Sequence, residues 1–400
     1  MRTRNFSRAS FTLIELLLVI GVTAVLSTVV LVVINPAELL KQARDSQRLN
    51  DLYTLNKALA IREVGTQGTS GSSSTVYISI PDTSPTCANL GLLALPPGWS
   101  WGCVPSSTLR NIDGTGWIPL DLTTFASGPP ITKWPIDPVN ATSSGHYYAY
   151  VTGGSWKLAG NLESKKRALM PPTDGGLDPA VYEIGSNLTL APFTHGLFAY
   201  WNFDEGAGFA TSDKGGYGYN GTLTGSPAWA NGKENNALSF NGPTDDYIST
   251  SDISSQDWSS ISITFWAKWD GTTQSGYAGA YYKSGGNDIG RLLINGSGGM
   301  LIQNGNGNFS SNSGAVPVNQ WAHIAYVYDQ SAGKEFIYVN GVNQGQQSRT
   351  GNITQNTDVF TIGRGFVDAT YSYGGIIDEM RIYRRALSET QIKSIYDATK

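Results

Sequence analysis

The feature that most constrains this chain is an apolar stretch at residues 11–34, FTLIELLLVIGVTAVLSTVVLVVI, which contains a single acid, Glu15. As a helix, roughly 24 residues at ~1.5 Å each reach ~36 Å, which is enough to span a bilayer. A carboxylate inside hydrocarbon is costly, so Glu15 requires a partner charge. The preceding MRTRNFSRAS carries Arg2, Arg4 and Arg8 and no acid, which predicts a cytoplasmic N-terminus and an outward-facing remainder.

A cleavable secretory signal is one alternative, but its apolar core is usually shorter and ends in a small-residue cleavage site. Here the small residues Ala9 and Ser10 precede the apolar run. This order and the FTLIELL motif resemble the class III signals of type IV pilins and pseudopilins, although that family strongly prefers Gly at the position where this chain has Ser10. The resemblance implies that a prepilin peptidase removes a basic leader, 1–10, by cutting between Ser10 and Phe11. It also implies N-methylation of Phe11 and pairing of Glu15 with the terminal amine of a neighbouring subunit. An ordinary single-pass anchor is the other reading.

Composition agrees with an exported, β-rich protein. Charged residues make up 14% of the chain, aromatic residues 11%, and there are 47 glycines. The net charge of −4 gives no support to nucleic-acid binding. In an oxidising compartment Cys87 and Cys103 can close a short loop as a disulfide, and free thiols are the alternative.

Beyond the apolar run, the helical pattern continues to residue 64 and becomes amphipathic, so residues 11–64 predict a hydrophobic and then an amphipathic helix. Asn35-Pro36 predicts a kink or break between the two halves, since Pro lacks the N–H that a helix needs. Residues 65–75 are rich in Gly and Ser and predict a flexible linker.

Residues 76–192 predict a small β-rich domain. The segments VYISIPD, HYYAYVT and SWKLAGNLE have the composition of strands. The order of the motifs here is similar to that of pseudopilin-like globular heads. Asp113, Asp137 and Asp174 lie in turn-rich stretches, where carboxylates cap turns; a calcium loop is the less favoured alternative.

Residues 196–397 contain many short strand candidates separated by Gly and Asn turns, which indicate a two-sheet sandwich. The segments GLFAYWNFDEGAG, ALSFNGPTDDYI, ISITFWAKW, QWAHIAYVYD, FIYVNG, TIGRG and GGIIDEMRIYRRALSETQI resemble, in that order, concanavalin-like laminin-G-type domains. Alternation along the strands predicts inward-facing side chains at Trp266, Trp321, Phe336, Tyr338, Phe360, Ile376 and Ile382. The predicted fold class is therefore α+β multidomain: a long N-terminal transmembrane and pilin-type helix, a small β-rich pilin-like head and a C-terminal all-β jelly-roll sandwich.

Few residues point to catalysis. His146, His195 and His323 are far apart in the sequence, with no Ser or Cys nucleophile arrangement beside them. Asp245-Asp246 and Asp378-Glu379 are adjacent pairs, and neighbouring side chains in a strand point to opposite faces. We therefore predict that the protein is not an enzyme, and a membrane-tethered glycan hydrolase is the least favoured function.

The laminin-G-type resemblance implies a calcium site at Asp204 and Asp378, completed by loop oxygens near Asn220-Gly221. The alternative is that these acids act structurally, by capping turns or by pairing with Arg381 or Arg384.

Carbohydrate binding is the other activity expected of such a domain. Trp269, Tyr277, Tyr281 and Tyr282 lie in a Gly- and Asn-rich region, where exposed aromatic rings can stack on sugar rings. A generic protein-contact role is the alternative.

Together these features predict a type IV pilin-like or pseudopilin-like surface protein that displays a laminin-G-like adhesion or carbohydrate-binding module. Its bulk favours a minor or tip subunit. The expected partners are other pilin-like subunits, the prepilin peptidase, the membrane, and glycans or surface proteins. The precursor would lie in the inner membrane and the assembled subunit at the cell surface. The alternative is a secretion or structural component whose sandwich is only a docking domain.

Overall fold

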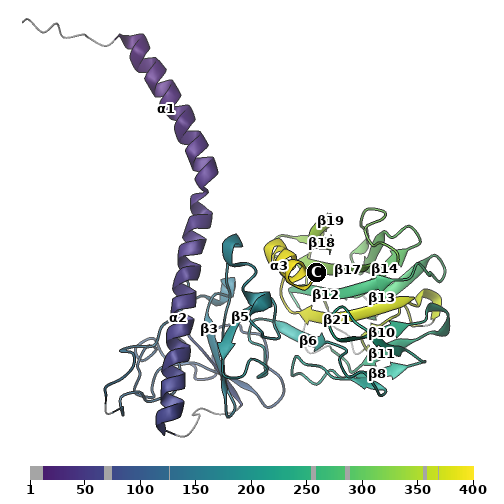
Figure 1. Ribbon diagram of the computed structural model, residues 1–400, viewed down its shortest axis with the longest axis horizontal. Helices are drawn as coiled ribbons and strands as arrows, with labels where there is room; N and C mark the ends of the chain where they lie inside the picture. Colours follow the sequence, from purple (N-terminus) through teal and green to yellow (C-terminus); the bar gives the residue numbers. More distant parts are fainter. Residues whose placement is uncertain are drawn as a thin grey trace, which may run out of the picture.

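The computed structural model describes residues 12–66, 74–125, 127–253, 258–283, 289–354, 358–367 and 369–400. Two helices follow one another at the N-terminus, the second packs on a small sheet, and a β-sandwich forms the C-terminal half (Figure 1). The predicted leader 1–10, the processing residues Ser10 and Phe11, and most of the predicted linker lie outside the described residues.

Helix α1, Leu13–Ile34, begins with a reciprocal cap. Thr12 N donates to Glu15 Oε2 at 2.9 Å, and Glu15 N donates to Thr12 Oγ1 at 3.3 Å. The helix ends at Asn35, whose φ is 43°, and Pro36 opens helix α2, Pro36–Thr66. The predicted break at Asn35-Pro36 is therefore confirmed, and Figure 1 shows the change of direction there.

Side chains 12–27 of this first segment are all exposed. Within the part of the chain that the structure describes, no helix combines the length and the apolar character needed to cross a membrane. The span predicted over 11–34 is thus not confirmed and stays a prediction.

Helix α2 packs on a sheet of five described strands in the order β2-β1-β3-β4-β5, and we call this unit, residues 36–192, the head. The strands are β1 Thr75–Ile78, β2 Ser100–Gly102, β3 Tyr148–Thr152, β4 Trp156–Gly160 and β5 Tyr182–Gly185; short 3-10 helices are η1 Thr142–Ser144, η2 Lys165–Arg167 and η3 Pro171–Thr173. Leucines at helical spacing, Leu52, Leu55 and Leu59, are buried against Trp117 and Tyr148. The apolar face of α2 is therefore what holds this sheet. Strands form in all three segments where the sequence predicts them.

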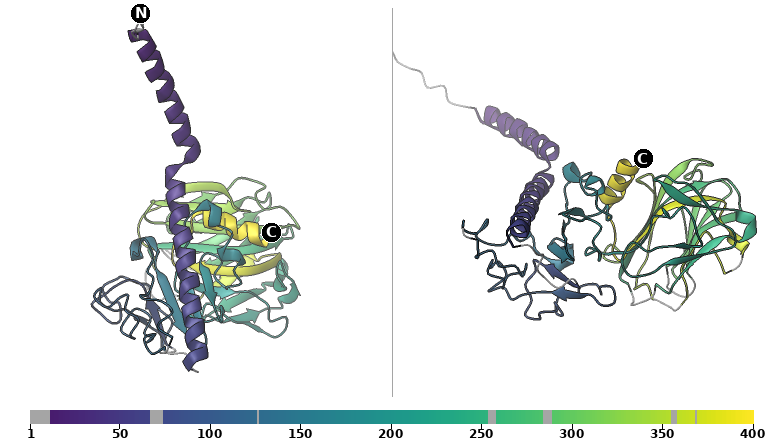
Figure 2. Two further views of the ribbon diagram at one scale, coloured as in Figure 1. Left: turned by 60° about the vertical axis from the view of Figure 1, so that its left-hand side comes forward. Right: turned by 60° about the horizontal axis from the view of Figure 1, so that its bottom comes forward.

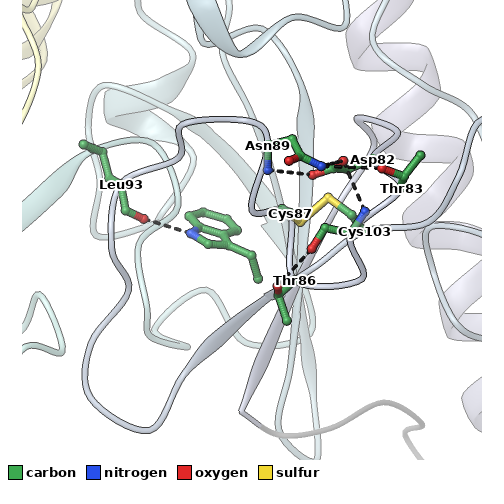
Figure 3. Close-up of a disulfide and its surroundings, with 9 residues drawn as sticks. Asp82, Thr83, Thr86, Cys87, Asn89, Leu93 and Cys103 are labelled. Carbon is green, nitrogen blue, oxygen red and sulfur yellow. Dashed lines mark hydrogen bonds between the residues drawn. A yellow bond between two sulfur atoms is a disulfide. The ribbon is translucent and has the colours of Figure 1, made fainter.

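A disulfide joins Cys87 to Cys103 in the head, with an Sγ–Sγ distance of 2.11 Å (Figure 3). Beside it, Asp82 accepts hydrogen bonds from Asn89 N at 3.0 Å and Asn89 Nδ2 at 2.8 Å. These bonds close the turn that carries Cys87. The predicted disulfide is confirmed, and the free-thiol alternative is excluded.

The sandwich consists of two antiparallel sheets. The docking sheet has the order β19-β18-β17-β12-β21-β10-β9, with β6 paired to β21; the distal sheet has the order β16-β15-β14-β13-β20-β11-β8-β7. The docking-sheet strands are β6 Leu197–Trp201, β9 Ala228–Asn231, β10 Asn236–Phe240, β12 Ser260–Trp269, β17 Trp321–Asp329, β18 Lys334–Val339, β19 Val342–Ser348 and β21 Gly375–Tyr383. The distal-sheet strands are β7 Ala210–Thr211, β8 Gly221–Thr224, β11 Tyr247–Thr250, β13 Tyr277–Lys283, β14 Gly290–Asn295, β15 Met300–Asn304, β16 Gly307–Ser310 and β20 Thr361–Ile362. The remaining elements are η4 Gly242–Thr244, η5 Ala369–Tyr371 and helix α3, Glu389–Thr399.

The docking sheet is covered on both faces. Its inner face shares the core between the sheets, and its outer face packs on α3 and on the head. This outer contact is a second apolar set, the interdomain cluster: Ala180, Phe193, Leu197, Tyr200, Ala325, Val327, Tyr338, Tyr383, Leu387, Ile392 and Ile395. Figures 1 and 2 show α3 on the side of the sandwich that faces the head.

This double burial corrects the predicted set of inward-facing residues. Phe360 and Ile382 lie in the core between the sheets, as expected. Tyr338 instead belongs to the interdomain cluster on the outer face, Phe336 packs against that cluster, and Trp266 contacts His323 and Tyr396. Trp321 and Ile376 are half-buried outside both clusters. A strand buried on both faces has apolar residues at nearly every position, so alternation alone does not reveal its inner face.

Candidate ligand-binding surface

The four aromatic residues predicted to stack on sugars divide into two pairs. Trp269 and Tyr281 are 1% and 0% exposed and belong to the core between the sheets, so their predicted role is wrong. Tyr277 and Tyr282 are half-buried on β13 and lie on the outer face of the distal sheet. A register shift between Gly279 and Tyr281 turns Tyr281 inward and Tyr282 outward. The sequence gives no sign of this bulge.

A loop crosses the outer face of β13 and completes the surface. At Gly279 an added Cβ would lie 2.1 Å from Gly365 N, so only glycine admits this approach. The loop is closed by Gly365 N, which donates to Tyr371 O at 2.9 Å, and by Tyr373 N, which donates to Gly363 O at 2.9 Å. These bonds place the side chains of the loop over the sheet.

The resulting cluster, which we call the aromatic platform, consists of Tyr277, Tyr282, Arg291, Phe366 and Tyr371. The Arg291 guanidinium lies 5.1 Å from the ring centres of both Phe366 and Tyr371. The Tyr282 and Phe366 rings are 5.7 Å apart, and the Tyr277 and Tyr371 rings 5.8 Å. Phe366 is 36% exposed. Rings of this kind offer flat apolar faces, and Tyr hydroxyls add hydrogen-bonding groups.

Arg291 is held in place from both sides of the platform. It lies opposite Tyr282 and Gln303 in neighbouring strands. Its Nε donates to Gln303 Oε1 at 2.7 Å, and its Nη1 donates to Gly365 O at 3.1 Å. The guanidinium is therefore a fixed cationic donor beside the aromatic rings. Sequence reasoning missed Arg291, Phe366 and Tyr371; the one available signal was three aromatic residues, Phe366, Tyr371 and Tyr373, in the segment after TIGRG.

Asp204 and Asp378, the acids predicted to bind calcium, both accept hydrogen bonds from the turn at residues 233–236. Asp204 Oδ1 accepts from Asn236 N at 3.1 Å, while Asp378 Oδ2 accepts from Lys233 N at 2.8 Å and Glu234 N at 3.1 Å. Burial raises the pKa of Asp378 to about 7. Among the described residues, no group of three or more His, Cys, Asp or Glu side chains is arranged to hold a metal ion. These contacts give both acids a structural role, and the calcium site stays a prediction.

Asp378 and Glu379 do not point to opposite faces, so that expectation is wrong. Ile377 and Met380 both lie in the core between the sheets, which leaves the two acids on the outer face. The cause is a bulge: the pairing of β21 with β12 shifts here, and Glu379 has a φ of 55°. The Glu379 carboxylate accepts from Tyr200 Oη at 2.9 Å and pairs with Arg381 Nη2 at 2.5 Å.

The remaining candidate acids cap turns. Asp113 Oδ1 accepts from Thr115 N at 3.0 Å, Asp137 Oδ1 from Val139 N at 2.7 Å, and Asp174 Oδ1 from Gly176 N at 2.7 Å. Asp246, next to Asp245, accepts from Ser226 N at 2.7 Å. Turn capping is therefore the observed role of the three acids in the head.

Two of the histidines are packed inside the protein. His195 Nδ1 lies 2.8 Å from Thr194 Oγ1, and its ring stacks on Tyr147 with centres 4.6 Å apart. His323 packs against Trp266. Burial lowers the pKa of each imidazole to about 3. Both rings are therefore neutral at physiological pH and serve as packing groups.

Comparison with known proteins agrees with the fold. The family described as the concanavalin A-like lectin/glucanases superfamily matches residues 241–393. No curated protein matches the chain. The C-terminal domain is thus a concanavalin A-like, laminin-G-like jelly roll, as the sequence predicts. The family match does not reach the N-terminal helices, so the type IV pilin resemblance stays a prediction.

Several solved structures resemble half of the chain. Domain 4 of AbnA, a GH43 extracellular arabinanase from Geobacillus stearothermophilus in complex with arabinotriose, is 23% identical, with 50% of this chain and 98% of that chain covered and a TM-score of 0.41. The binding domain of Paraclostridial Mosquitocidal Protein 1 is 14% identical, with 50% and 52% covered and a TM-score of 0.42. The binding domain of Botulinum Neurotoxin DC in complex with SialylT is 15% identical, with 51% and 52% covered and a TM-score of 0.40. This chain spans about half the length of the two toxin domains.

Proposed function

We propose that the jelly roll binds glycans through the aromatic platform. The observation that carries this proposal is the fixed group of Tyr277, Tyr282, Arg291, Phe366 and Tyr371 on the outer face of the distal sheet. The opposite side of the sandwich is occupied by α3 and the head, so the platform lies on the sheet that remains available. Aromatic faces stack on the apolar faces of sugar rings, while Arg291 donates hydrogen bonds to hydroxyl or carboxylate oxygens.

A glycan array with the full chain in detergent tests this proposal. Against the best-bound glycan, Tyr282→Ala and Phe366→Ala should each weaken binding about 10-fold, which corresponds to ~1.4 kcal/mol. The matched control is Phe209→Ala, because Phe209 is 84% exposed and lies off the platform. Loss of binding in the control but not in the platform variants would contradict the proposal. A chain that binds no glycan supports the docking-domain alternative. Repeating the array in EDTA examines the calcium prediction separately.

We also propose that the N-terminal helices join this module to a filament of similar subunits, as the pilin resemblance implies. The exposed apolar side chains of α1 and the buried face of α2 support a division between an assembly half and a head-binding half. Glu15 caps the first turn of α1, close to the predicted new N-terminus. The proposal is the same whether the filament is a pilus or part of a secretion system.

The mature N-terminus tests the filament proposal. Mass spectrometry of the membrane fraction should find N-methyl-Phe11 as the first residue. A Ser10→Gly variant, which has the residue usual in the family, should be processed at least as completely and serves as the control. A chain that retains Met1 would instead be a plain membrane anchor.

A further inference from the structure

The end of the head from which α1 emerges exposes apolar side chains. Leu39 and Leu40, at the start of α2, are 48% and 60% exposed. Leu169, two residues after η2, is 51% exposed. Lys165 N donates to Glu38 Oε1 at 2.6 Å, so η2 lies against the start of α2. Three large apolar side chains are therefore open to the surroundings on two segments that touch one another.

The same two segments, residues 38–41 and 165–169, carry a concentration of positive charge, and we call their surface the collar. Glu38 is the one acid in their sequence, and it stands against four cations: Lys41, Lys165, Lys166 and Arg167. Within the part of the chain that the structure describes, no acid pairs with any of these four cations. A chain whose net charge is −4 therefore has a local excess of positive charge at this end.

The acids next to the collar do not cancel this charge. Glu163, two residues before η2, is paired with two arginines of α2 at 2.6 Å each. Across a hollow beside η2, α3 contributes Glu389 and Asp397. Asp397 is paired with Lys393 at 2.6 Å and with Lys400 at 2.9 Å. The collar and its surroundings together therefore remain cationic.

The collar begins where the apolar helix ends. Helix α1 ends at Ile34, Pro36 opens α2, and Figure 1 shows α1 leading away from this end of α2. With residues 11–34 in a bilayer, as the sequence predicts, Leu39 is ~8 Å beyond the apolar helix, and the headgroup layer is ~5–8 Å deep on each side. Apolar side chains combined with Lys and Arg are the composition that suits this layer.

We propose that the collar docks on anionic phospholipids while the apolar run lies in the bilayer. The leucines enter the boundary between headgroups and acyl chains, and the four cations bind lipid phosphates. Each Lys or Arg near an anionic leaflet contributes ~1 kcal/mol. The head is then held against the membrane before the subunit joins a filament. This proposal rests on the predicted membrane position of the apolar run and is independent of glycan binding at the aromatic platform.

Hydrogen exchange of the full chain in lipid nanodiscs tests this inference. In discs that contain phosphatidylglycerol, the amides of residues 165–169 should exchange about 10-fold more slowly than in discs of phosphatidylcholine alone. Salt at about 0.5 M should remove most of the difference, because it screens charges at the surface. The double variant Lys165→Gln/Lys166→Gln removes half of the cations and should also lose most of the difference. Both side chains are exposed, so the melting temperature should not change.

Lys57→Gln/Lys133→Gln is the matched control, because it also removes two exposed lysines of the head. Lys57 lies ~24 Å beyond Lys41 along α2, so this variant should keep the full difference between the two kinds of disc. Protection that follows the number of chains per disc rather than the lipid would identify a second copy as the occupant and overturn the proposal.

Extraction with alkaline carbonate separates failure of the anchor from failure of the collar. A chain that carbonate removes from the membrane contradicts the membrane position of the apolar run, and the collar proposal with it. A chain that resists carbonate but exchanges equally in both kinds of disc contradicts the collar alone.

Discussion

At the scale of single residues, Arg48 joins the stem helix to the head. Its side chain is fully buried and contacts three carboxylates: Asp45 at 2.8 Å, Asp137 at 2.7 Å and Glu163 at 2.6 Å. Asp45 also accepts from Ser164 N at 2.8 Å. Each acid therefore has further partners, which is what makes a buried ion cluster tolerable. Asp137 shows the limit of sequence reasoning, since the turn-capping role was predictable but the partner 89 residues away was not.

Replacing Arg48 by Met should destabilise the head by about 3–5 kcal/mol, because it leaves buried carboxylates without their cation. Urea denaturation of the full chain in detergent measures the loss. Arg44→Met is the matched control on the same helix: Arg44 pairs with Glu163 at 2.6 Å but is 34% exposed, so the variant should cost about 0–1 kcal/mol. Equal losses in the two variants would show that burial of Arg48 is not decisive.

At the scale of elements, the strands were predictable and their faces were not. Alternation and Gly/Asn turns located the strands, because composition and turn chemistry are local properties. Two bulges, at Gly279–Tyr281 in β13 and at Glu379 in β21, reverse the faces that alternation assigns. The loop that brings Phe366 and Tyr371 onto β13 is a long-range contact, which no local pattern encodes. The sequence therefore predicted two of the five platform residues, Tyr277 and Tyr282.

The buried Asp378, at the bulge in β21, predicts that the stability of the fold depends on pH. The pKa of Asp378 is about 7 in the folded protein and 3.8 without the fold. Between these pH values the folded chain binds more protons than the unfolded chain, so the free energy of unfolding falls as pH rises. The stabilisation by the protonated Asp378 carboxyl is fully present below about 3.8 and is lost as pH rises to 7. Asp378→Asn, which stays neutral, should match the native protein near pH 4 and exceed it at pH 8 by at least ~1 kcal/mol.

Melting temperatures measured from pH 4 to 8 test this expectation. The control is Asp397→Asn, because the hydrogen bonds from Lys393 and Lys400 hold the pKa of Asp397 below its ordinary value. Removing that carboxylate should give a small loss at pH 8 and no gain. A native protein whose stability relative to Asp378→Asn does not change with pH would contradict the assignment of Asp378 as the titrating group.

At the scale of the whole molecule, the interdomain cluster makes the head and the sandwich one packed body. Ala180 and Phe193 from the head side contact the outer face of the docking sheet together with Ile392 and Ile395 of α3. Lys157 Nζ lies 4.1 Å from the centre of the Phe193 ring and pairs with Glu183 at 2.8 Å. The sequence predicted two domains here, 76–192 and 196–397, but not their contact, because the apolar residues that join them are distributed from 180 to 395.

Coupling of this kind predicts a single unfolding transition for the two parts, and Phe193→Ala should separate it into two. Phe193 is 3% exposed, and truncating a buried Phe costs about 3–5 kcal/mol, here at the contact between the parts. Calorimetry of the full chain in detergent measures the number of transitions. Phe309→Ala is the matched control: Phe309 is 5% exposed and lies in the core between the two sheets, so this variant should lower the transition temperature without dividing the transition. Two transitions in the native protein would show that the cluster does not couple the head to the sandwich.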